Sequence, residues 1–230
     1  MPLFLKTRNT ELQERMDSPD CNLVKLKNTY KQFRWINQFL SRWNTLYKNE
    51  IRPVLELQNG TATLLDIGFG GGDIPIHLYK LAKKDGYHLN ITAIETDKRS
   101  VKYARSLNAP SNIKFEYKHS KELVKQGEKF DFVISNHLLH HLTRSTLQSI
   151  CNEAEQLAEK KVIFNDLSRS DVAYSFFYVS SNLIFWNSFI SYDGLISIKR
   201  SYTFQELTDI APTGWKVQKY FPYRLILIYE

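Results

Sequence analysis

Seven short apolar runs recur along the chain between residues 63 and 229. They are rich in Ile, Val, Phe and Leu, as is typical of strands that are buried on both faces of a sheet. We therefore predict β-strands over residues 63–67, 91–96, 113–117, 130–135, 162–165, 216–221 and 224–229.

Between several of these runs the apolar spacing changes to that of an amphipathic helix. Thr143 is a candidate N-cap, and after it apolar residues recur at i, i+3, i+4 and i+7: Leu147, Ile150, Cys151, Ala154, Leu157 and Ala158. A second helical pattern follows the glycine-rich turn at residues 68–72, with Pro75 in its first turn. Thr203 and Glu206 form a capping-box pattern that predicts the start of a third helix.

This alternation of strands and helices predicts the α/β class, as a Rossmann-like, doubly wound sheet of seven strands with helices on both faces. Only Pro222 and Tyr223 separate the last two strands, too few residues for a crossover helix, so we expect the last strand to be antiparallel. Helical spacing over residues 23–47 predicts an N-terminal helical lid (1–50) ahead of the main domain (51–230). Residues 168–202 form an insertion between strands 5 and 6, which we interpret as a substrate cap.

Composition and charge narrow the class of protein. A chain of 230 residues with 43% hydrophobic content is long enough to bury a full core. The net charge is +7, but lysine and arginine are scattered, which favours a solvated surface over a nucleic-acid-binding face. Cys21 and Cys151 lie far apart without metal-ligand spacing. We therefore expect reduced thiols in a cytoplasmic protein, and we predict no metal.

Two segments have features to compare with membrane signals. The N-terminus has too short an apolar run and too many charges for a secretory signal. The uncharged stretch Val172–Tyr192 is long enough to cross a bilayer. It contains five serines and two asparagines, which is poor for a lone spanning helix, so we expect it to pack within the fold.

The stretch LLDIGFGGGDIP carries four of the nine glycines of the chain directly after the first predicted strand. Gly68, Gly70 and Gly72 leave the backbone bare, so a ligand can approach it closely before the next helix begins. No Gly-Lys-Ser/Thr follows, and the spacing is not GxGxxG. Counted from Gly68, the sixth position of that pattern holds Asp73 instead of glycine. Its negative charge at a helix N-terminus would repel a pyrophosphate and suits a ligand with a positive centre.

A second acidic residue, Glu95, ends the next predicted strand, where a carboxylate can accept hydrogen bonds from a ribose diol. Asp66, the glycine turn, Asp73 and Glu95 together describe a nucleoside ligand that has cationic character and no phosphates. S-adenosylmethionine is the common molecule of that description.

Several motifs then resemble the class I S-adenosylmethionine-dependent methyltransferases. LLDIGFGGGD resembles the first motif of that family and AIETD its ribose-binding motif, while FDFVISNHLLHHL and KVIFNDL resemble the fourth and fifth strands. NDLSRS, YDGLISIKRSYTFQEL and FPYRLILI are similar to bacterial small-molecule methyltransferases often encoded near polyketide or quinone pathways. The resemblance implies S-adenosylmethionine as cofactor and S-adenosylhomocysteine as product.

The resemblance also implies roles for individual residues. Asp66 and the glycines would face the methionine moiety, Glu95 and Thr96 would hold the ribose, and Asn136 would close the other side of the ligand. The family usually places an aspartate after the third strand to bind the adenine amino group. This chain has His119 and Ser120 there, and a neutral imidazole could accept that hydrogen bond.

Candidate catalytic residues follow strands 4 and 5, at the carboxyl edge where open α/β sheets bind ligands. Histidine is the first candidate for a base near neutral pH. The resemblance of His140-His141-Leu142 to a His-Asp-Trp motif in small-molecule O-methyltransferases favours His140, with His141 as the alternative. Asp166 could orient an acceptor hydroxyl or a histidine, or could cap the turn at Ser168.

The aromatic segment behind the fifth strand predicts a roof over the cleft, together with Trp35 and Trp43: Phe176, Phe177, Tyr178, Phe185, Trp186 and Phe189. Such a roof implies a small hydrophobic acceptor, and peripheral membrane contact aided by the positive charge is possible. We predict O-methylation of a phenolic or polyketide-like compound. The alternatives are C-methylation of a quinone or isoprenoid precursor and an inactive methyltransferase-like binding module. No nucleic-acid partner is expected, and the oligomeric state stays open.

Overall fold

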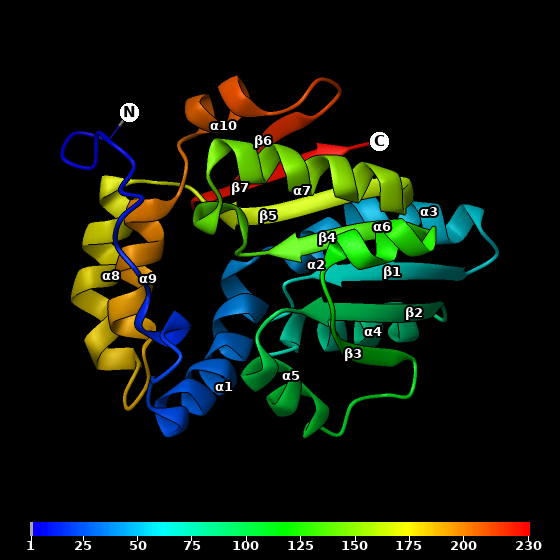
Figure 1. Cartoon of the computed structure of the whole chain (residues 1–230), viewed down its shortest axis with the longest axis horizontal. Helices are drawn as coiled ribbons and strands as arrows, with labels where there is room; N and C mark the ends of the chain where they lie inside the picture. The colour runs from blue at the N-terminus through cyan, green and yellow to red at the C-terminus, as the bar shows by residue number, and fades with distance from the viewer. Residues whose placement is uncertain (1) are drawn as a thin grey trace.

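A single seven-stranded sheet runs through the molecule in the order β3-β2-β1-β4-β5-β7-β6 (Figure 1). The structure is a computed structural model, and it describes residues 2–230. The strands are β1 (Thr61–Ile67), β2 (His88–Glu95), β3 (Ile113–Tyr117), β4 (Phe130–Asn136), β5 (Ala158–Leu167), β6 (Lys216–Tyr220) and β7 (Arg224–Tyr229). β1 to β5 are parallel, and β7 pairs antiparallel with both β5 and β6. The predicted fold class is therefore confirmed, including the antiparallel last strand.

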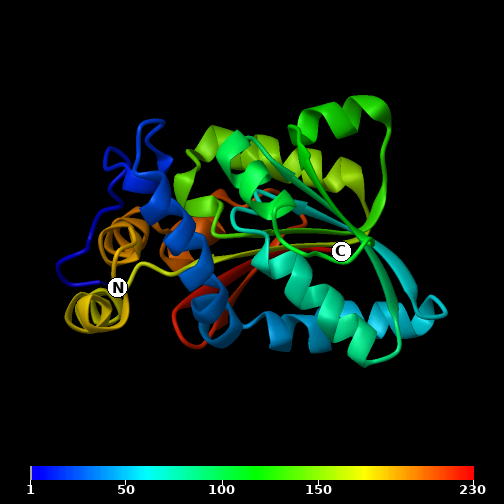
Figure 2. The ribbon, with the colours of Figure 1, turned by 90° about the horizontal axis from the view of Figure 1, so that it is seen from below.

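Helices cover both faces of the sheet (Figure 2). One face carries α2 (Trp43–Leu46), η2 (Tyr47–Ile51), α3 (Arg52–Leu57), α4 (Asp73–Lys84) and α5 (Lys98–Arg105). The other carries α6 (Ser120–Gln126), α7 (Arg144–Leu157) and α10 (Phe204–Ile210). Two apolar cores lie between the sheet and these layers, because the strand side chains alternate between the two faces.

The predicted helix starts are confirmed by their caps. The Thr143 hydroxyl accepts a hydrogen bond from the Thr146 amide at the start of α7. Thr203 and Glu206 form a reciprocal capping box at the start of α10. These local signals are reliable because each satisfies backbone N–H groups that the first turn of a helix leaves unpaired.

The N-terminal part contains one long helix, α1 (Leu23–Leu40), preceded by a largely irregular segment with one short turn, η1 (Arg15–Asp17). We call residues 3–21 the N-terminal strap. Asp171 accepts hydrogen bonds from the backbone amides of residues 3–5, and Asp193 accepts them from those of Arg15 and Met16. The strap therefore follows the inserted helices to the carboxyl edge of the sheet (Figure 1). In the lid expected over residues 1–50, helices other than this turn begin only at residue 23.

The insertion between β5 and β6 forms two helices, α8 (Asp171–Ile184) and α9 (Ile190–Arg200), which pack against each other through Phe177 and Gly194. The prediction that aromatic residues of this segment roof the cleft is wrong, because none of them lines it: α8 lies outside α9 (Figure 1), and Phe176, Tyr178 and Trp186 are exposed. Trp35 is 66% exposed, whereas Trp43 is buried in the core of the sheet domain. Within residues 2–230, no helix has the length and apolarity required to span a bilayer.

Candidate active site

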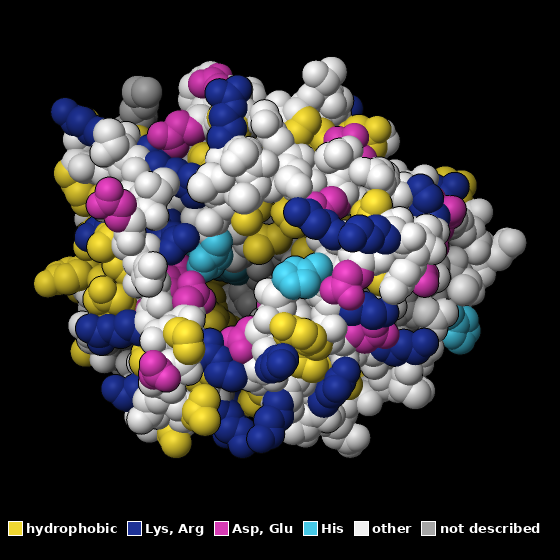
Figure 3. All heavy atoms as spheres, in the orientation of Figure 1, with side chains coloured by type: hydrophobic (Ala, Val, Ile, Leu, Met, Phe, Trp, Pro, Cys, Tyr) yellow, Lys and Arg dark blue, Asp and Glu magenta, His cyan; other side chains and the backbone are white. Residues whose placement is uncertain are grey.

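A cleft of about 760 Å³ opens at the carboxyl ends of β1, β2 and β4. The turns after these strands form one wall, and the strap, α1 and α9 form the other. Figure 3 shows the hollow in the middle of this face, with acidic and histidine side chains gathered at its rim. The cleft therefore lies where parallel α/β sheets generally bind ligands.

The glycine-rich turn forms the floor of the cleft at its β1 end. Gly68, Gly70 and Gly72 all have positive φ angles, of 77°, 53° and 75°, which side-chain-bearing residues rarely adopt. A Cβ on Gly70 would meet no atom within 4 Å, whereas one on Gly72 would lie 2.9 Å from the Phe115 ring. Gly70 thus leaves open space beside the cleft, while Gly72 permits close packing of α4 on the sheet.

Asp66 lines the cleft beside this turn and is 1% exposed. Neither of its carboxylate oxygens has a hydrogen-bond partner within residues 2–230. Burial, with the negative charges of Asp73 and Glu95, raises the pKa of Asp66 well above its usual range. A buried carboxyl group without a partner is costly, so this site is suited to a ligand that brings a positive, hydrogen-bonding group.

Glu95 also lines the cleft, at the end of β2. Its Oε2 accepts a hydrogen bond of 3.0 Å from the Gly70 amide, and its Oε1 accepts one of 2.7 Å from the Thr96 amide. These bonds fix the carboxylate beside the glycine turn. Thr96 lines the cleft as well, so the predicted ribose-binding pair is brought to the same wall.

Asp73 and Gly72 lie behind the cleft surface rather than on it. The Asn37 amide group of α1 donates a hydrogen bond of 2.9 Å to Asp73. Burial raises the pKa of Asp73 to about 6 despite that bond. Asp73 therefore joins α1 to the start of α4 and contributes its charge to the cleft from behind.

His119 and Ser120 are not brought to the cleft. His119 is exposed, and its amide donates a hydrogen bond to the Glu122 side chain at the first turn of α6. The Ser120 hydroxyl is buried against Glu153. Tyr117, at the end of β3, lines the cleft in their place. The side chains at the start of α6 are thus used for helix capping and packing, which the motif alignment did not predict.

His140 lies in η3 (Leu139–His141) and is 2% exposed. Its Nδ1 is 2.7 Å from Asp166 Oδ1, and its Nε2 is 3.2 Å from Glu14 Oε1. Burial alone would lower the pKa of His140, but these two carboxylates outweigh it and raise the pKa to about 10. Both ring nitrogens are thereby occupied. Asp166 orients His140, one of the roles proposed for it from the sequence.

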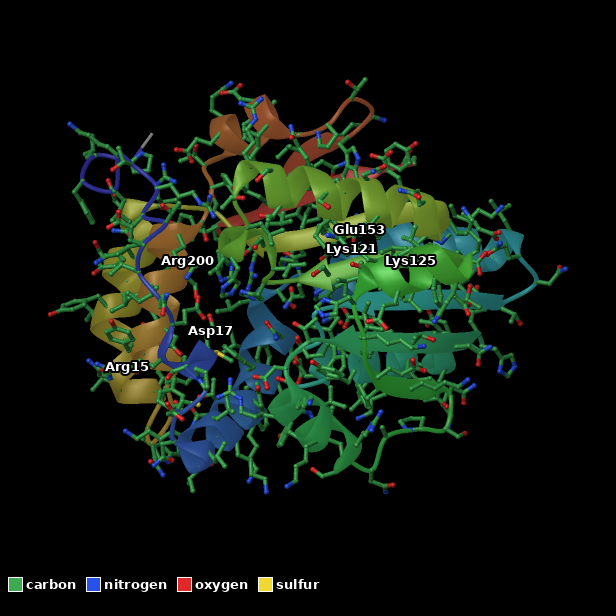
Figure 4. All side chains as sticks on the ribbon, in the orientation of Figure 1. Arg15, Asp17, Lys121, Lys125, Glu153 and Arg200 are labelled. Carbon is green, nitrogen blue, oxygen red and sulfur yellow. The ribbon has the colours of Figure 1, made fainter. Side chains whose placement is uncertain are left out.

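His141 has a 28% exposed side chain and lines the cleft. Burial and the neighbouring His140 lower the pKa of His141 to about 4, so its imidazole is neutral at pH 7. Its Nδ1 lies 3.6 Å from Asp17 Oδ2. Partial burial and the charge of Glu14 raise the pKa of Asp17 to about 6, although its side chain is 50% exposed. Figure 4 shows Asp17 on the strap and Arg200 on α9, both on the side of the opening opposite the sheet.

Asn136 lines the cleft after β4, and its side-chain oxygen accepts a hydrogen bond of 3.0 Å from the Trp43 indole. Glu14 and Asp17 were not predicted from the sequence, and the strap brings them to the histidines from more than 120 positions away. No periodicity or motif marks these two residues in the sequence. Only the tertiary path of the strap identifies them.

Comparison with known proteins gives a family match and three curated relatives. A family model described as a methyltransferase domain matches residues 64–161. A ubiquinone/menaquinone biosynthesis C-methyltransferase, UbiE, from Rickettsia bellii is 25% identical over 134 residues, covering 56% of this chain and 51% of the relative. The protein of the same description from Rickettsia typhi is 29% identical over 91 residues, covering 38% and 36%. The chain thus spans about half the length, or less, of the curated relatives it matches.

Solved structures share the whole fold at low sequence identity. The plantazolicin methyltransferase BpumL, in complex with a pentazolic desmethylPZN analogue and SAH, has a TM-score of 0.61 at 11% identity, covering 90% of this chain and 94% of that one. The magnesium protoporphyrin IX methyltransferase ChlM from Synechocystis PCC 6803, with bound SAM, has a TM-score of 0.52 at 14% identity, covering 96% and 98%. At these identities the likeness concerns the fold.

Proposed function

We propose that the chain is an S-adenosylmethionine-dependent methyltransferase. Residues 64–161 match a family model described as a methyltransferase domain, and the class I motifs of the sequence agree with that match. The acceptor is a small molecule that carries a hydroxyl group on an apolar framework. When bound, S-adenosylmethionine supplies an electrophilic methyl group on a sulfonium centre. The residues of the chain supply binding, alignment and exclusion of water.

The observation that carries the proposal is the unpartnered carboxyl group of Asp66 beside the open space at Gly70. A ligand that offers a cationic amino group would satisfy the Asp66 oxygens, and a nucleoside would lie along the turn next to Glu95. The residues present therefore fit S-adenosylmethionine. A pyrophosphate fits poorly, because Asp66, Asp73 and Glu95 place three carboxyl groups near the turn.

We assign removal of the acceptor proton to the Asp17–His141 pair at the rim of the cleft. Both side chains reach the cleft, and the Asp17 carboxyl, with a pKa of about 6, titrates close to neutral pH, as a general base should. His140 is less suited to this role than the sequence implied, because carboxylates occupy both of its nitrogens. Its role here is to hold Glu14 and the η3 turn in place.

The acceptor-binding part of the cleft is only partly apolar. Met16, Phe33 and Leu138 contribute apolar walls, while Glu14 and Asp17 are acidic. This mixture supports an acceptor with a phenolic or enolic hydroxyl. The names of the Rickettsia relatives favour the alternative, C-methylation of a quinone precursor. An inactive binding module is the remaining alternative.

We further propose that the outer face of α8 touches membranes from which an apolar acceptor is taken. No charged residue occurs from Val172 to Tyr192, and large side chains there are exposed: Val172, Phe176, Tyr178, Val179, Leu183, Ile184 and Trp186. Hydrogen bonds from α1 to the Trp186 and Asn187 carbonyls place the basic helix α1 beside the end of α8. Exposed aromatic and basic residues together suit an anionic lipid surface.

Calorimetry with S-adenosylmethionine and S-adenosylhomocysteine tests the cofactor, and a mass-spectrometry screen of phenols and quinone precursors tests the acceptor. We expect wild type and an Asp209→Asn control, changed at an exposed site, to bind equally. Asp66→Asn should weaken binding by about 10-fold or more. Absence of binding by wild type would contradict the enzyme proposal, and a methyl group found on a ring carbon would establish the C-methylation alternative.

A further inference from the structure

We propose that Glu14, His140 and His141 form a binding site for a divalent first-row transition-metal ion at the acceptor end of the cleft. These residues can each direct one ligand atom to a common point, since the atoms lie within 4.8 Å of one another. This proposal goes beyond the sequence analysis, which predicted no metal because the cysteines lack ligand spacing.

The distances between the ligand atoms fit such a site. Glu14 Oε1 lies 3.2 Å from His140 Nε2 and 3.8 Å from His141 Nε2. Ligand atoms bound tetrahedrally at about 2.0–2.1 Å from zinc are separated by about 3.3–3.4 Å. Small side-chain rotations therefore suffice to place an ion between the three atoms. It would take the place of the proton between Glu14 and His140.

The surroundings of the ligands resemble those of known metal sites. Metal-bound histidines almost always donate their other ring N–H group to a carboxylate, carbonyl or water. His140 Nδ1 meets this pattern at 2.7 Å from Asp166, whereas His141 Nδ1 lies 3.6 Å from Asp17 and needs a small side-chain movement to form such a bond. The Ser197 hydroxyl donates a hydrogen bond of 2.7 Å to Glu14 Oε1 and so holds the carboxylate in place.

Direct arginine contact and access to the cleft distinguish the Glu14, His140 and His141 group from a second group of possible ligands nearby. His137, His140 and Asp166 are also close together, but the Arg224 guanidinium lies 2.8 Å from His137 Nε2 and would repel a cation there. Arg8 and Arg200 also lie near Glu14 and His141, and the charge of Arg200 helps to lower the pKa of His141, but their hydrogen bonds go to the backbone carbonyl of His140 and not to a ligand atom. Glu14 and His141 line the cleft, so a bound ion keeps an open coordination position toward the acceptor.

Two imidazoles and one carboxylate with an open position are the ligand set of catalytic zinc and non-haem iron sites. An ion held there would polarise an acceptor oxygen and favour loss of its proton to Asp17. This catalytic consequence rests on the proposed function. Binding of the ion does not, so the two are tested separately.

The test uses the full chain, stripped with a chelator and then titrated with Co²⁺ alone and with Zn²⁺ alone. We expect binding of Co²⁺ with the visible absorption bands of a low-symmetry site, and competition by Zn²⁺. Glu14→Gln and His141→Gln should each lower the affinity by about 100-fold or more, and Asp166→Asn by about 10–100-fold. His88→Ala, which removes an exposed histidine elsewhere, should bind like wild type.

Thermal melting and S-adenosylmethionine calorimetry on the same variants show whether each one is folded. The proposal is overturned if wild type binds Co²⁺ no more tightly than folded Glu14→Gln, or if His88→Ala loses as much affinity as His141→Gln. Metal binding without S-adenosylmethionine binding would leave the site standing and remove the proposed function. The reverse result would remove the site alone.

Discussion

The two ends of the cleft are built in different ways. The proposed cofactor end consists of backbone turns directly after β1 and β2, in which the Gly70 amide donates a hydrogen bond of 3.0 Å to Glu95. The acceptor end is assembled from the strap, η3 and α9, where Glu14 reaches both His140 and Ser197. The first end depends on local backbone geometry, and the second depends on the docking of segments that are distant in sequence. The same domain can therefore keep its cofactor end while its acceptor end changes.

The sharpest test of the local end compares two neighbouring glycines. Gly72→Ala places a Cβ 2.9 Å from Phe115 at a φ of 75°, so we expect it to destabilise the fold by about 2–4 kcal/mol. Gly70→Ala meets open space and should cost only about 1 kcal/mol of backbone strain. Its methyl group lies beside the cleft and should lower cofactor affinity by about 10-fold. Denaturant unfolding and calorimetry measure the two effects.

Equal losses of stability in both variants would mean that the turn is purely structural. That result would remove the main support for a ligand along Gly70. Normal affinity in a folded Gly70→Ala variant would have the same consequence.

Most of the fold and the placement of Asp66, Gly70 and Glu95 at one cleft could be predicted from the sequence, because both depend on contiguous residues. The caps at Thr143 and Thr203 and the turn after β1 each depend on a few neighbouring positions. The acceptor end could not be predicted in this way. Glu14 lies in a strap without apolar period, and the aromatic content of α8 does not reveal which face of the helix is covered.

The next prediction concerns the pH dependence of cofactor binding. Burial raises the pKa of Asp66 well above its usual range, so the free protein holds a proton there at acidic pH. A cationic ligand prefers the ionised carboxylate, so its binding releases a proton and its affinity falls as the pH falls. Between about pH 8 and about pH 5 we expect a loss of about 10-fold or more, which Asp66→Asn should abolish. Calorimetry in buffers of different ionisation enthalpy measures the released proton. Affinity that is independent of pH would contradict a cationic ligand at Asp66.

Docking of the strap at the other end makes stability depend on pH. Burial, with the nearby charges of Glu14 and Asp17, raises the pKa of Asp193 to about 7, although the amides of Arg15 and Met16 donate to it. Because the folded state binds this proton more tightly than the unfolded state, the free energy of unfolding falls as the pH rises from about 4 to about 7. We expect a decrease on the order of 4 kcal/mol from this group.

Asp193→Asn should reduce that slope, measured by urea unfolding in the presence of a chelator. Asp17, whose pKa is about 6, contributes in the same direction and should keep part of the slope. An unchanged slope in the variant would show that Asp193 does not account for this pH dependence.

The smallest expected effect on stability lies on the outer surface of the acceptor end. Trp35→Ser and Phe176→Ser replace exposed side chains, so each should change the free energy of unfolding by less than about 0.5 kcal/mol. Each should nevertheless weaken co-sedimentation with anionic vesicles, because less apolar surface enters the lipid. Leu57→Ser, at an exposed position on α3, is the matched control and should sediment like wild type. If all three variants sediment alike, charge alone accounts for any membrane contact, and the acceptor reaches the cleft from solution.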